Sequence, residues 1–368
     1  MVSIQNSTNN GSFLVKGAEI TFQHNQIDTA GAWELTYGSK DIIVAVIDSG
    51  IDFNHSQLEG VSWNNSDEIA DNGLDDDSNG YVDDTHGWDF VSNDNEPGPE
   101  TSDPIHWHAT FISGLIAGKL DGLGMVGVAP NVTVMDIRVL AATNYAGTTL
   151  EGFGDAIRYA VDNGADVINL SLHNYSNSSY YYDDIIYAIS QNVVIVSITG
   201  NTWVSDGGGR EYLSFPGGLN EVISVGATSY TQEIADYSNY GEWTEIVAPV
   251  GDEGTGIRST APGEEYFYGW GTSFAAPQVA AAIALMKSLN NSLTVSEIRD
   301  ILHKSATDLG DPGHDIYTGY GLLNVSKAVR AVLDPSVLLP PDDSSYQFLS
   351  IIPILAVITI IVIKKRKS

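Results

Sequence analysis

Residues 42–52 read "IIVAVIDSGID", a run of six apolar residues that is followed by Asp48. Three further short runs rich in apolar and β-branched residues span residues 132–140, 166–172 and 193–198. Largely apolar runs of this length are typical of strands that are buried on both faces. Such strands occur in parallel sheets that helices cover on both sides.

Segments with helical spacing of apolar residues lie between and after these runs. Two lie between the runs, at residues 151–164 and 182–192, and three follow them, at residues 272–289, 294–305 and 324–333. Strands that alternate with helices predict an α/β fold, here a doubly wound, mainly parallel central sheet with helices on both faces.

The composition excludes several kinds of site. The chain of 368 residues has 47 acidic and 16 basic residues, a net charge of −31, and no cysteine. A surface of this charge repels polyanions, so we expect no nucleic-acid partner. The absence of cysteine excludes disulfide bonds, thiolate metal sites and a cysteine nucleophile.

The C-terminus predicts a membrane anchor. Residues 348–363 are sixteen residues without a charge, and residues 364–368 read "KKRKS". We expect one transmembrane helix over 348–363, near the lower limit of a bilayer span, and a basic cytoplasmic tail over 364–368, with the preceding chain outside the cell. A buried core helix is the alternative. The rest divides into an N-terminal extension, 1–23, one continuous domain, 24–333, and a proline-containing acidic stalk, 334–347.

Two polar residues stand directly after predicted strands. Asp48 follows the run at 42–47, and Asn201 lies shortly after the run at 193–198. In doubly wound sheets, active sites lie outside the carboxyl ends of the strands. These side chains are therefore candidates for catalysis, although capping of the next turn or helix is the alternative role for each.

A third candidate lies in "GWGTSFAAPQVAAAIALM", residues 269–286. Small residues surround Ser273 at the start of a long apolar helix, and Pro277 is tolerated only near the first turn of such a helix. The free N–H groups and positive field at a helix N-terminus help to hold a developing oxyanion. Taken alone, Ser273 would be an ordinary helix cap.

Together these segments resemble the subtilisin-like serine peptidases, the subtilase family, over residues 24–333. The aspartate motif appears as "VAVIDSGID" and the serine motif as "GTSFAAPQVA", and the motifs follow one another in the order Asp, His, Ser that this family has. Other segments that look like the family's are "VINLSL", "SFPGGLNEVISVGATS", "YSNYG" and "VAPVG".

The histidine motif has to be chosen between two residues, His106 and His108. The family's motif begins His-Gly-Thr and continues to a later glycine. The match is "HATFISG", with His108 first, Thr110 third and Gly114 seventh, whereas His106 lies two residues before it. We therefore predict His108 as the catalytic base.

The resemblance implies a role for each of these residues. Asp48 would orient His108 and support its imidazolium, and His108 would take the proton of Ser273 as this serine attacks a peptide carbonyl. The side-chain amide of Asn201 and the backbone N–H of Ser273 would bind the oxyanion. The resemblance thus implies a membrane-anchored serine endopeptidase with a monomeric catalytic domain that acts on extracellular proteins or peptides.

Some residues depart from the family pattern. Ala109 replaces a glycine, and Phe111 stands where many relatives have a second histidine, which indicates a packing change. By resemblance, Ser171, Leu172 and His173 bind substrate, and His173 replaces a glycine there. Its bulky ring would narrow the pocket, or it would turn away to the surface.

Two other functions stay open at this stage. One is a catalytically impaired, membrane-tethered binding or scaffold protein, which Ala109 and His173 favour. The other is an enzyme that processes a single partner protein.

The stretch "DNGLDDDSNGYVDD", residues 71–84, predicts a calcium site. Oxygen ligands at alternate positions and a glycine for the turn match the first part of an EF-hand loop, but His86 stands where the closing glutamate is expected. A solvated acidic loop is the alternative. The candidate ligands are Asp75, Asp77, Asn79, Tyr81 through its carbonyl, and Asp83.

Overall fold

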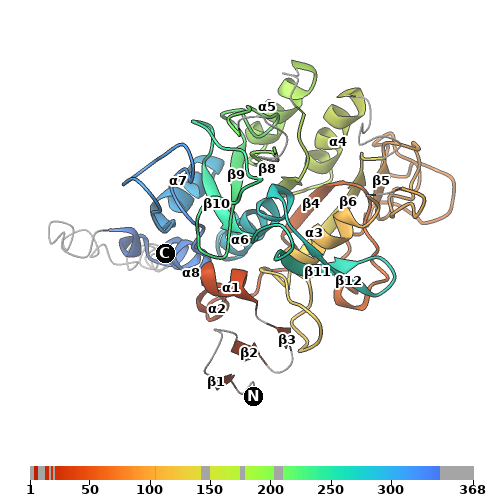
Figure 1. Cartoon of the computed structure of the whole chain (residues 1–368). Coiled ribbons are helices and arrows are strands. Elements are labelled where there is room, and N and C mark those ends of the chain that lie inside the picture. The colour runs from red at the N-terminus through yellow and green to blue at the C-terminus, as the bar shows by residue number, and fades with distance from the viewer. Residues whose placement is uncertain are drawn as a thin grey trace, which may run out of the picture.

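The computed structural model describes residues 4–6, 13–15, 18–19, 21–103, 105–141, 150–174, 179–202 and 210–339. A parallel sheet of seven strands, in the order β10-β9-β8-β7-β4-β6-β5, forms its centre (Figure 1). The strands are β4 (Ile43–Asp48), β5 (Gly87–Asp89), β6 (Thr133–Arg138), β7 (Val167–Leu170), β8 (Val194–Ile198), β9 (Ile223–Thr228) and β10 (Ile246–Pro249).

Helices cover both faces of this sheet. They are α1 (Phe22–Gln26), α2 (Thr29–Trp33), α3 (His108–Ala117), α4 (Leu150–Asp162), α5 (Tyr182–Ser190), α6 (Ala276–Leu289), α7 (Val295–Ser305) and α8 (Val325–Leu333). Short 3₁₀ turns are η1 (Ser56–Leu58), η2 (Ser179–Tyr181), η4 (Thr272–Phe274) and η5 (Pro335–Leu338).

The two larger hydrophobic cores among the described residues follow from the alternation of side chains along each strand. On β4, Val44 and Val46 pack with apolar residues of α3 and α6, whereas Ala45 and Ile47 pack on the other face with residues of α4 and α5. The expected doubly wound α/β sheet with helices on both faces is therefore confirmed.

Helix α6 runs through the larger core and is preceded by a separate turn. The segment 272–289, expected as one helix, divides into η4 and α6, with Pro277 in the first turn of α6. All residues of α6 up to Lys287 are buried, and its many alanines allow a close approach to the sheet. The division leaves Ser273 on the turn.

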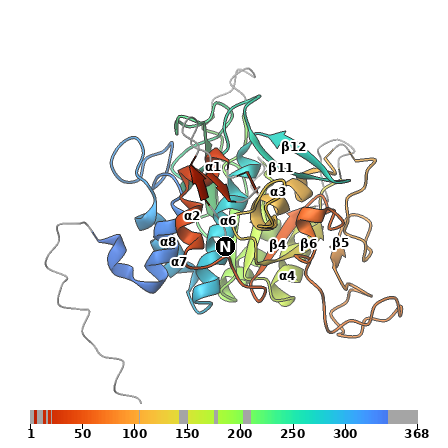
Figure 2. The same cartoon turned by 90° about the horizontal axis from the view of Figure 1, so that it is seen from below.

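Helix α2, near the start of the described domain, contacts its last helix, α8, as Figures 1 and 2 show. Arg330 Nη2 on α8 donates to the Gly31 carbonyl at 3.2 Å and to Glu34 Oε2 at 2.5 Å. A Cβ on Gly31 would lie 2.4 Å from Ser326 Oγ, so glycine permits this close approach.

Two small antiparallel sheets lie outside the central one. The hairpin β11 (Ile257–Ala261) and β12 (Glu265–Gly269) packs on α3 through β11. A second sheet is formed by β1 (Ile4–Asn6), β2 (Phe13–Val15) and β3 (Ala18–Glu19) in the N-terminal extension.

The predicted transmembrane segment, 348–363, lies outside the described residues. Within the described ranges, none of the helices is both long enough and apolar enough to cross a bilayer.

Candidate active site

The candidate site lies at the carboxyl edge of three neighbouring strands. Asp48 ends β4, Ser171 follows β7, and Asn201 lies shortly after β8, and these strands are adjacent in the order β8-β7-β4. Strands separated by long stretches of sequence therefore present their polar termini at one edge, as expected for a doubly wound sheet.

Asp48 and His108 are joined by a hydrogen bond. His108 Nδ1 lies 2.8 Å from Asp48 Oδ1, which also accepts the backbone N–H of Ser49 at 2.8 Å. Asp48 is fully buried, whereas the His108 side chain is 15% exposed. A carboxylate at Nδ1 favours the tautomer with its proton on that nitrogen, which leaves Nε2 as the acceptor.

The turn after Asp48 is held by two features. Gly50 has a φ of 94°, and a Cβ there would lie 2.3 Å from the Pro97 carbonyl oxygen, so glycine is required. Asp136 Oδ2 accepts the N–H of Ile51 at 2.8 Å. Burial, and to a smaller degree the Asp48 charge, raises the pKa of Asp136 well above its usual range. Asp136 was not predicted as a site residue, because its stretch of sequence indicates only a buried strand.

His106 points elsewhere. Its Nδ1 lies 2.5 Å from the Asp103 carbonyl oxygen, three residues earlier in the same loop. Of the two histidines, His108 is the one that contacts Asp48.

Ala109 and Phe111, the two departures from the family pattern near His108, both pack in the core. Ala109 is fully buried, and its N–H donates to Ser49 Oγ at 3.1 Å. Phe111 is also fully buried, and its ring lies 4.3 Å from that of Phe274. Phe111 therefore fills space in the core, which agrees with the packing change expected at this position.

Ser273 is tied to the end of β7 by reciprocal hydrogen bonds. Ser273 Oγ donates to the Ser171 carbonyl at 3.2 Å, and Ser171 Oγ donates to the Ser273 carbonyl at 2.7 Å. Asn169 Nδ2 donates to Ser171 Oγ at 2.9 Å. The ring of Phe274, the residue after Ser273, lies 5.5 Å from the ring of His108, so the histidine and the serine turn belong to one site.

Asn201 is oriented by Thr272. Its Oδ1 accepts the Thr272 backbone N–H at 2.8 Å and the Thr272 hydroxyl at 3.0 Å. Gly271, with a φ of 134°, leaves a space there: a Cβ would lie 3.8 Å from Asn201 Nδ2 and 4.0 Å from the Ser273 nitrogen. Both nitrogens thus lie within 4.0 Å of one point, together with Asn201 Oδ1 at 3.7 Å, and two N–H donors close to one point are what an oxyanion requires.

The predicted substrate-binding residues continue from β7. Ser171 is buried within the site, and Leu172 is partly buried against the core that contains α4 and α5. Burial lowers the pKa of His173, so this side chain is neutral at pH 7.

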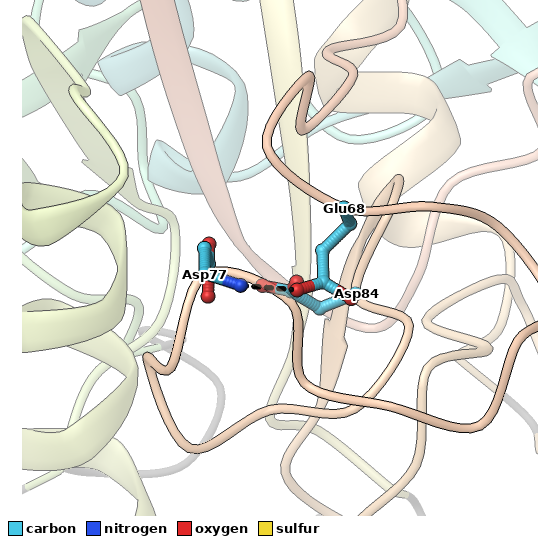
Figure 3. Close-up of side chains that lie close together, drawn as sticks. All are labelled: Glu68, Asp77 and Asp84. Carbon is cyan, nitrogen blue, oxygen red and sulfur yellow. Dashed lines mark hydrogen bonds between the residues drawn. The ribbon is translucent and has the colours of Figure 1, made fainter.

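The acidic loop gathers three carboxylates, Glu68, Asp77 and Asp84. Figure 3 shows them converging, and oxygens of all three lie within 4.8 Å of one another. Glu68 and Asp84 are buried. Of the predicted calcium ligands, Asp77 belongs to this cluster, whereas Glu68 and Asp84 were not predicted.

The other predicted ligands have different local partners. Asp75 accepts the N–H groups of Asn79 and Gly80, and Asp83 accepts those of Asn72 and Gly73. The ring of Tyr81 packs against Trp88, Phe90 and Tyr159.

Polar side chains surround the three carboxylates. Asn79 Nδ2 donates to Asp77 and to Asp84, each at 3.0 Å, and so does Asn65 Nδ2. The Tyr159 hydroxyl donates to Asp84 at 2.6 Å. Burial and this hydrogen bond raise the pKa of Tyr159, which keeps its proton.

Comparison with known proteins gives one consistent result. The model of the subtilase family matches residues 39–321. Subtilisin DY of Bacillus licheniformis is 32% identical over 295 residues, 80% of this chain and 93% of that protein. A thermophilic serine proteinase of Bacillus sp. (strain AK1) is 33% identical over 299 residues, 81% of this chain and 64% of that protein. The halolysin-like extracellular serine protease Nep of Natrialba magadii is 30% identical over 305 residues, 83% of this chain and 50% of that protein.

The chain thus spans about half to two thirds of the length of two of these relatives, and more than nine tenths of subtilisin DY. The region matched by the family model lies inside the domain predicted for residues 24–333.

Proposed function

The chain belongs to the subtilase family, and on that premise we propose that it is a serine endopeptidase that hydrolyses peptide bonds of extracellular proteins. The observation that carries the proposal is the 2.8 Å hydrogen bond between His108 Nδ1 and Asp48 Oδ1. It lies at the same edge of the sheet as Ser273 and Asn201. No further group is needed for acyl transfer.

The proposed reaction has two halves. In the first, Ser273 Oγ attacks the peptide carbonyl as His108 Nε2 takes its proton, and Asp48 stabilises the resulting imidazolium. The N–H groups of Asn201 and Ser273 hold the oxyanion, and His108 then gives its proton to the leaving amine. In the second half, water attacks the acyl-enzyme by the same route and releases Ser273.

The packing of Ala109 favours an enzyme over a scaffold protein. The methyl group is accommodated in the core, and the N–H of Ala109 is bonded to Ser49 beside Asp48. His173, neutral and larger than the glycine it replaces, would narrow the substrate pocket beside Ser171 and Leu172. We therefore propose a peptidase of restricted specificity for the residue before the scissile bond.

The acidic loop is proposed to bind a structural Ca²⁺ ion. All its donors are oxygens, the kind of ligand that Ca²⁺ prefers, and three carboxylates in close contact repel one another without a cation. Glu68, Asp77 and Asp84 would hold the ion, and Asn79 would add its side-chain oxygen if its amide turned over. Asp75, Tyr81 and Asp83 would shape the loop around it.

We also propose that residues 348–363 anchor the enzyme in the cell membrane by a single span. The uncharged run and the basic residues after it support a cytoplasmic C-terminus and an external catalytic domain. The relative Nep is named as an extracellular protease, which agrees with catalysis outside the cell.

Labelling with a fluorophosphonate probe tests the peptidase proposal. These reagents react with a serine that a neighbouring base has activated. We expect the calcium-loaded full chain to be labelled, and we expect Ser273→Ala to abolish the label. A folded, calcium-loaded parent chain that stays unlabelled would contradict the proposal and favour the scaffold function.

A further inference from the structure

Two aromatic side chains, Trp107 and Phe274, flank the imidazole of His108. The Trp107 ring stands edge-on to the His108 ring at 5.7 Å, and the Phe274 ring lies 5.5 Å from the same imidazole. Trp107 also contacts the rings of Phe111 at 5.8 Å and Phe274 at 6.2 Å. The candidate base is therefore bordered by an apolar aromatic wall.

The hairpin β11–β12 extends this wall. Phe267 and Gly269 lie on one face of β12, since side chains alternate along a strand. The Phe267 ring stands edge-on to Trp107 at 6.0 Å. A Cβ on Gly269 would lie 2.6 Å from Phe274 Cε2, so glycine lets the strand approach the ring next to Ser273. Figures 1 and 2 show this hairpin beside α3, which begins with His108.

The wall opens to solvent at its outer end. Phe267 is 42% exposed, and Trp107 is partly buried. A surface of large apolar rings that runs from a catalytic histidine to solvent is a common form of ligand-binding surface. Tyr266 and Tyr268 lie on the opposite face of β12, where Tyr266 contacts His55 and Arg258.

The chemistry indicates which part of a substrate would meet this wall. His108 gives its proton to the amine of the leaving peptide, so the residue after the scissile bond has to pass close to the imidazole and to the rings that flank it. Ser171, by contrast, contacts Ser273 from the end of β7, on which the residues before the bond are expected to lie.

We propose that Trp107 and Phe267 bind the side chain that follows the scissile bond and select aromatic or large aliphatic residues there. This inference rests on the proposed peptidase function and extends it to the leaving side of the substrate. A surface of apolar aromatic rings buries a large apolar side chain well, and it offers a carboxylate no partner.

The test compares internally quenched peptides that differ only in the residue after the cut, namely phenylalanine, leucine, alanine or aspartate. We expect the parent chain to have a kcat/KM for phenylalanine about 10-fold above that for alanine. Phe267→Ala and Trp107→Ala should each reduce this ratio to about 2 or less. Fluorophosphonate titration gives the concentration of competent enzyme in every sample, which corrects for misfolded protein.

Tyr268→Ala is the matched control. It removes an aromatic ring of the same strand, 67% exposed, from the face that points away from Trp107. We expect the ratio of kcat/KM for phenylalanine to kcat/KM for alanine in this variant to equal that of the parent chain. A parent enzyme without preference, or an equal fall in kcat/KM for all four peptides in Phe267→Ala and Trp107→Ala, would overturn the inference. A parent chain that the probe does not label would overturn the peptidase function itself, and the inference with it.

Discussion

The Asp48 carboxylate uses one oxygen for two contacts. Oδ1 accepts from His108 and from the Ser49 N–H, whereas the buried Oδ2 has no hydrogen-bond donor among the described residues. Burial raises the pKa of the neighbouring Asp136 carboxyl well above its usual range. Of these two carboxyls, Asp48 is the one that contacts the imidazole.

The two histidines of the "HWH" stretch should differ sharply in effect. We expect His108→Ala to lower kcat by at least about 10⁴-fold, because the serine loses its base. His106→Ala should retain kcat within about 3-fold, because the His106 ring contacts the Asp103 carbonyl of its own loop and not Asp48. Kinetics on one peptide substrate measure both. Loss of activity in His106→Ala but not in His108→Ala would contradict the prediction and identify His106 as the base.

Asn201→Ala should lower kcat with little change in KM. One of two donors to the oxyanion would be lost, and this donor matters only once charge has developed on the carbonyl oxygen. The expected fall is about 10²- to 10³-fold, a value carried over from the subtilisin family. A matching rise in KM at constant kcat would instead make Asn201 a residue for ground-state binding.

At the scale of elements, the sequence predicts best where a pattern is local. The apolar runs at 42–47 and 193–198 correspond to β4 and β8 within one or two residues. Helix α3 was not predicted, because it is apolar all round and buried along its length after His108, which removes the amphipathic pattern. The hairpin β11–β12 also escaped prediction, since β12 is mostly exposed.

The acidic loop is harder to predict for a different reason. An EF-hand spacing counts ligands within one loop, whereas Glu68 comes from before the loop and Asp84 from its last position. Glu68 accepts the N–H groups of Asp76, Asp77 and Asp83, so the loop wraps around this side chain. Only the folded chain reveals such a partner.

Removal of calcium should lower the melting temperature. A free ion concentration of 100 times the dissociation constant adds about 2.7 kcal/mol of stability, which corresponds to about 4 °C in a domain of this size. We expect this loss on chelation in the parent chain and in Asp71→Asn, which removes an exposed carboxylate of the same loop. Asp84→Asn should melt at nearly the same temperature with or without chelator. A parent melting curve that chelation leaves unchanged would exclude the site.

Helix α1 carries a buried histidine that should weaken the fold in acid. His24 contacts Thr29 Oγ1 and the Val126 carbonyl, and burial lowers its pKa from 6.5 to about 4. The folded chain thus binds fewer protons than the unfolded chain between these two pKa values, so stability falls as pH drops from 6.5 towards 4 and is unaffected above that range.

Replacement of this histidine measures the effect. Between pH 7 and pH 5, the parent should lose about 2 kcal/mol of unfolding free energy more than His24→Gln, which cannot gain a proton. Denaturant unfolding of both chains at the two pH values gives this difference. Equal losses would show that His24 titrates alike in the folded and unfolded chains.

At the scale of the whole molecule, we expect the proposed peptidase domain to be separable from the predicted anchor. We expect the full chain to remain with membranes after an alkaline carbonate wash and to be released by detergent. A chain that ends at residue 339, where the described structure ends, should be recovered in the soluble fraction. Recovery of the full chain in the soluble fraction would contradict a membrane span at 348–363.

The candidate catalytic residues can be predicted from the sequence, because each belongs to a short motif next to a strand or helix end. The sequence indicates the surroundings of the site poorly. Trp107 and Phe267 come into contact because the β11–β12 hairpin packs on α3. Neither stretch of sequence contains a pattern that would predict this contact. Residues that act through long-range packing, Asp136 among them, require the structure.

The candidate site takes its parts from three adjacent strands and from a turn near the end of the domain. Asp48 and Ser273 are brought together only when β4, β7 and β8 and helix α6 have all assembled. If the chain is the proposed peptidase, a molecule that is still folding, or one that has lost a strand, cannot hydrolyse any chain, its own included. Autolysis should accordingly require an encounter between an intact molecule and an opened one. Its rate should rise with protein concentration, and dilution should preserve the enzyme.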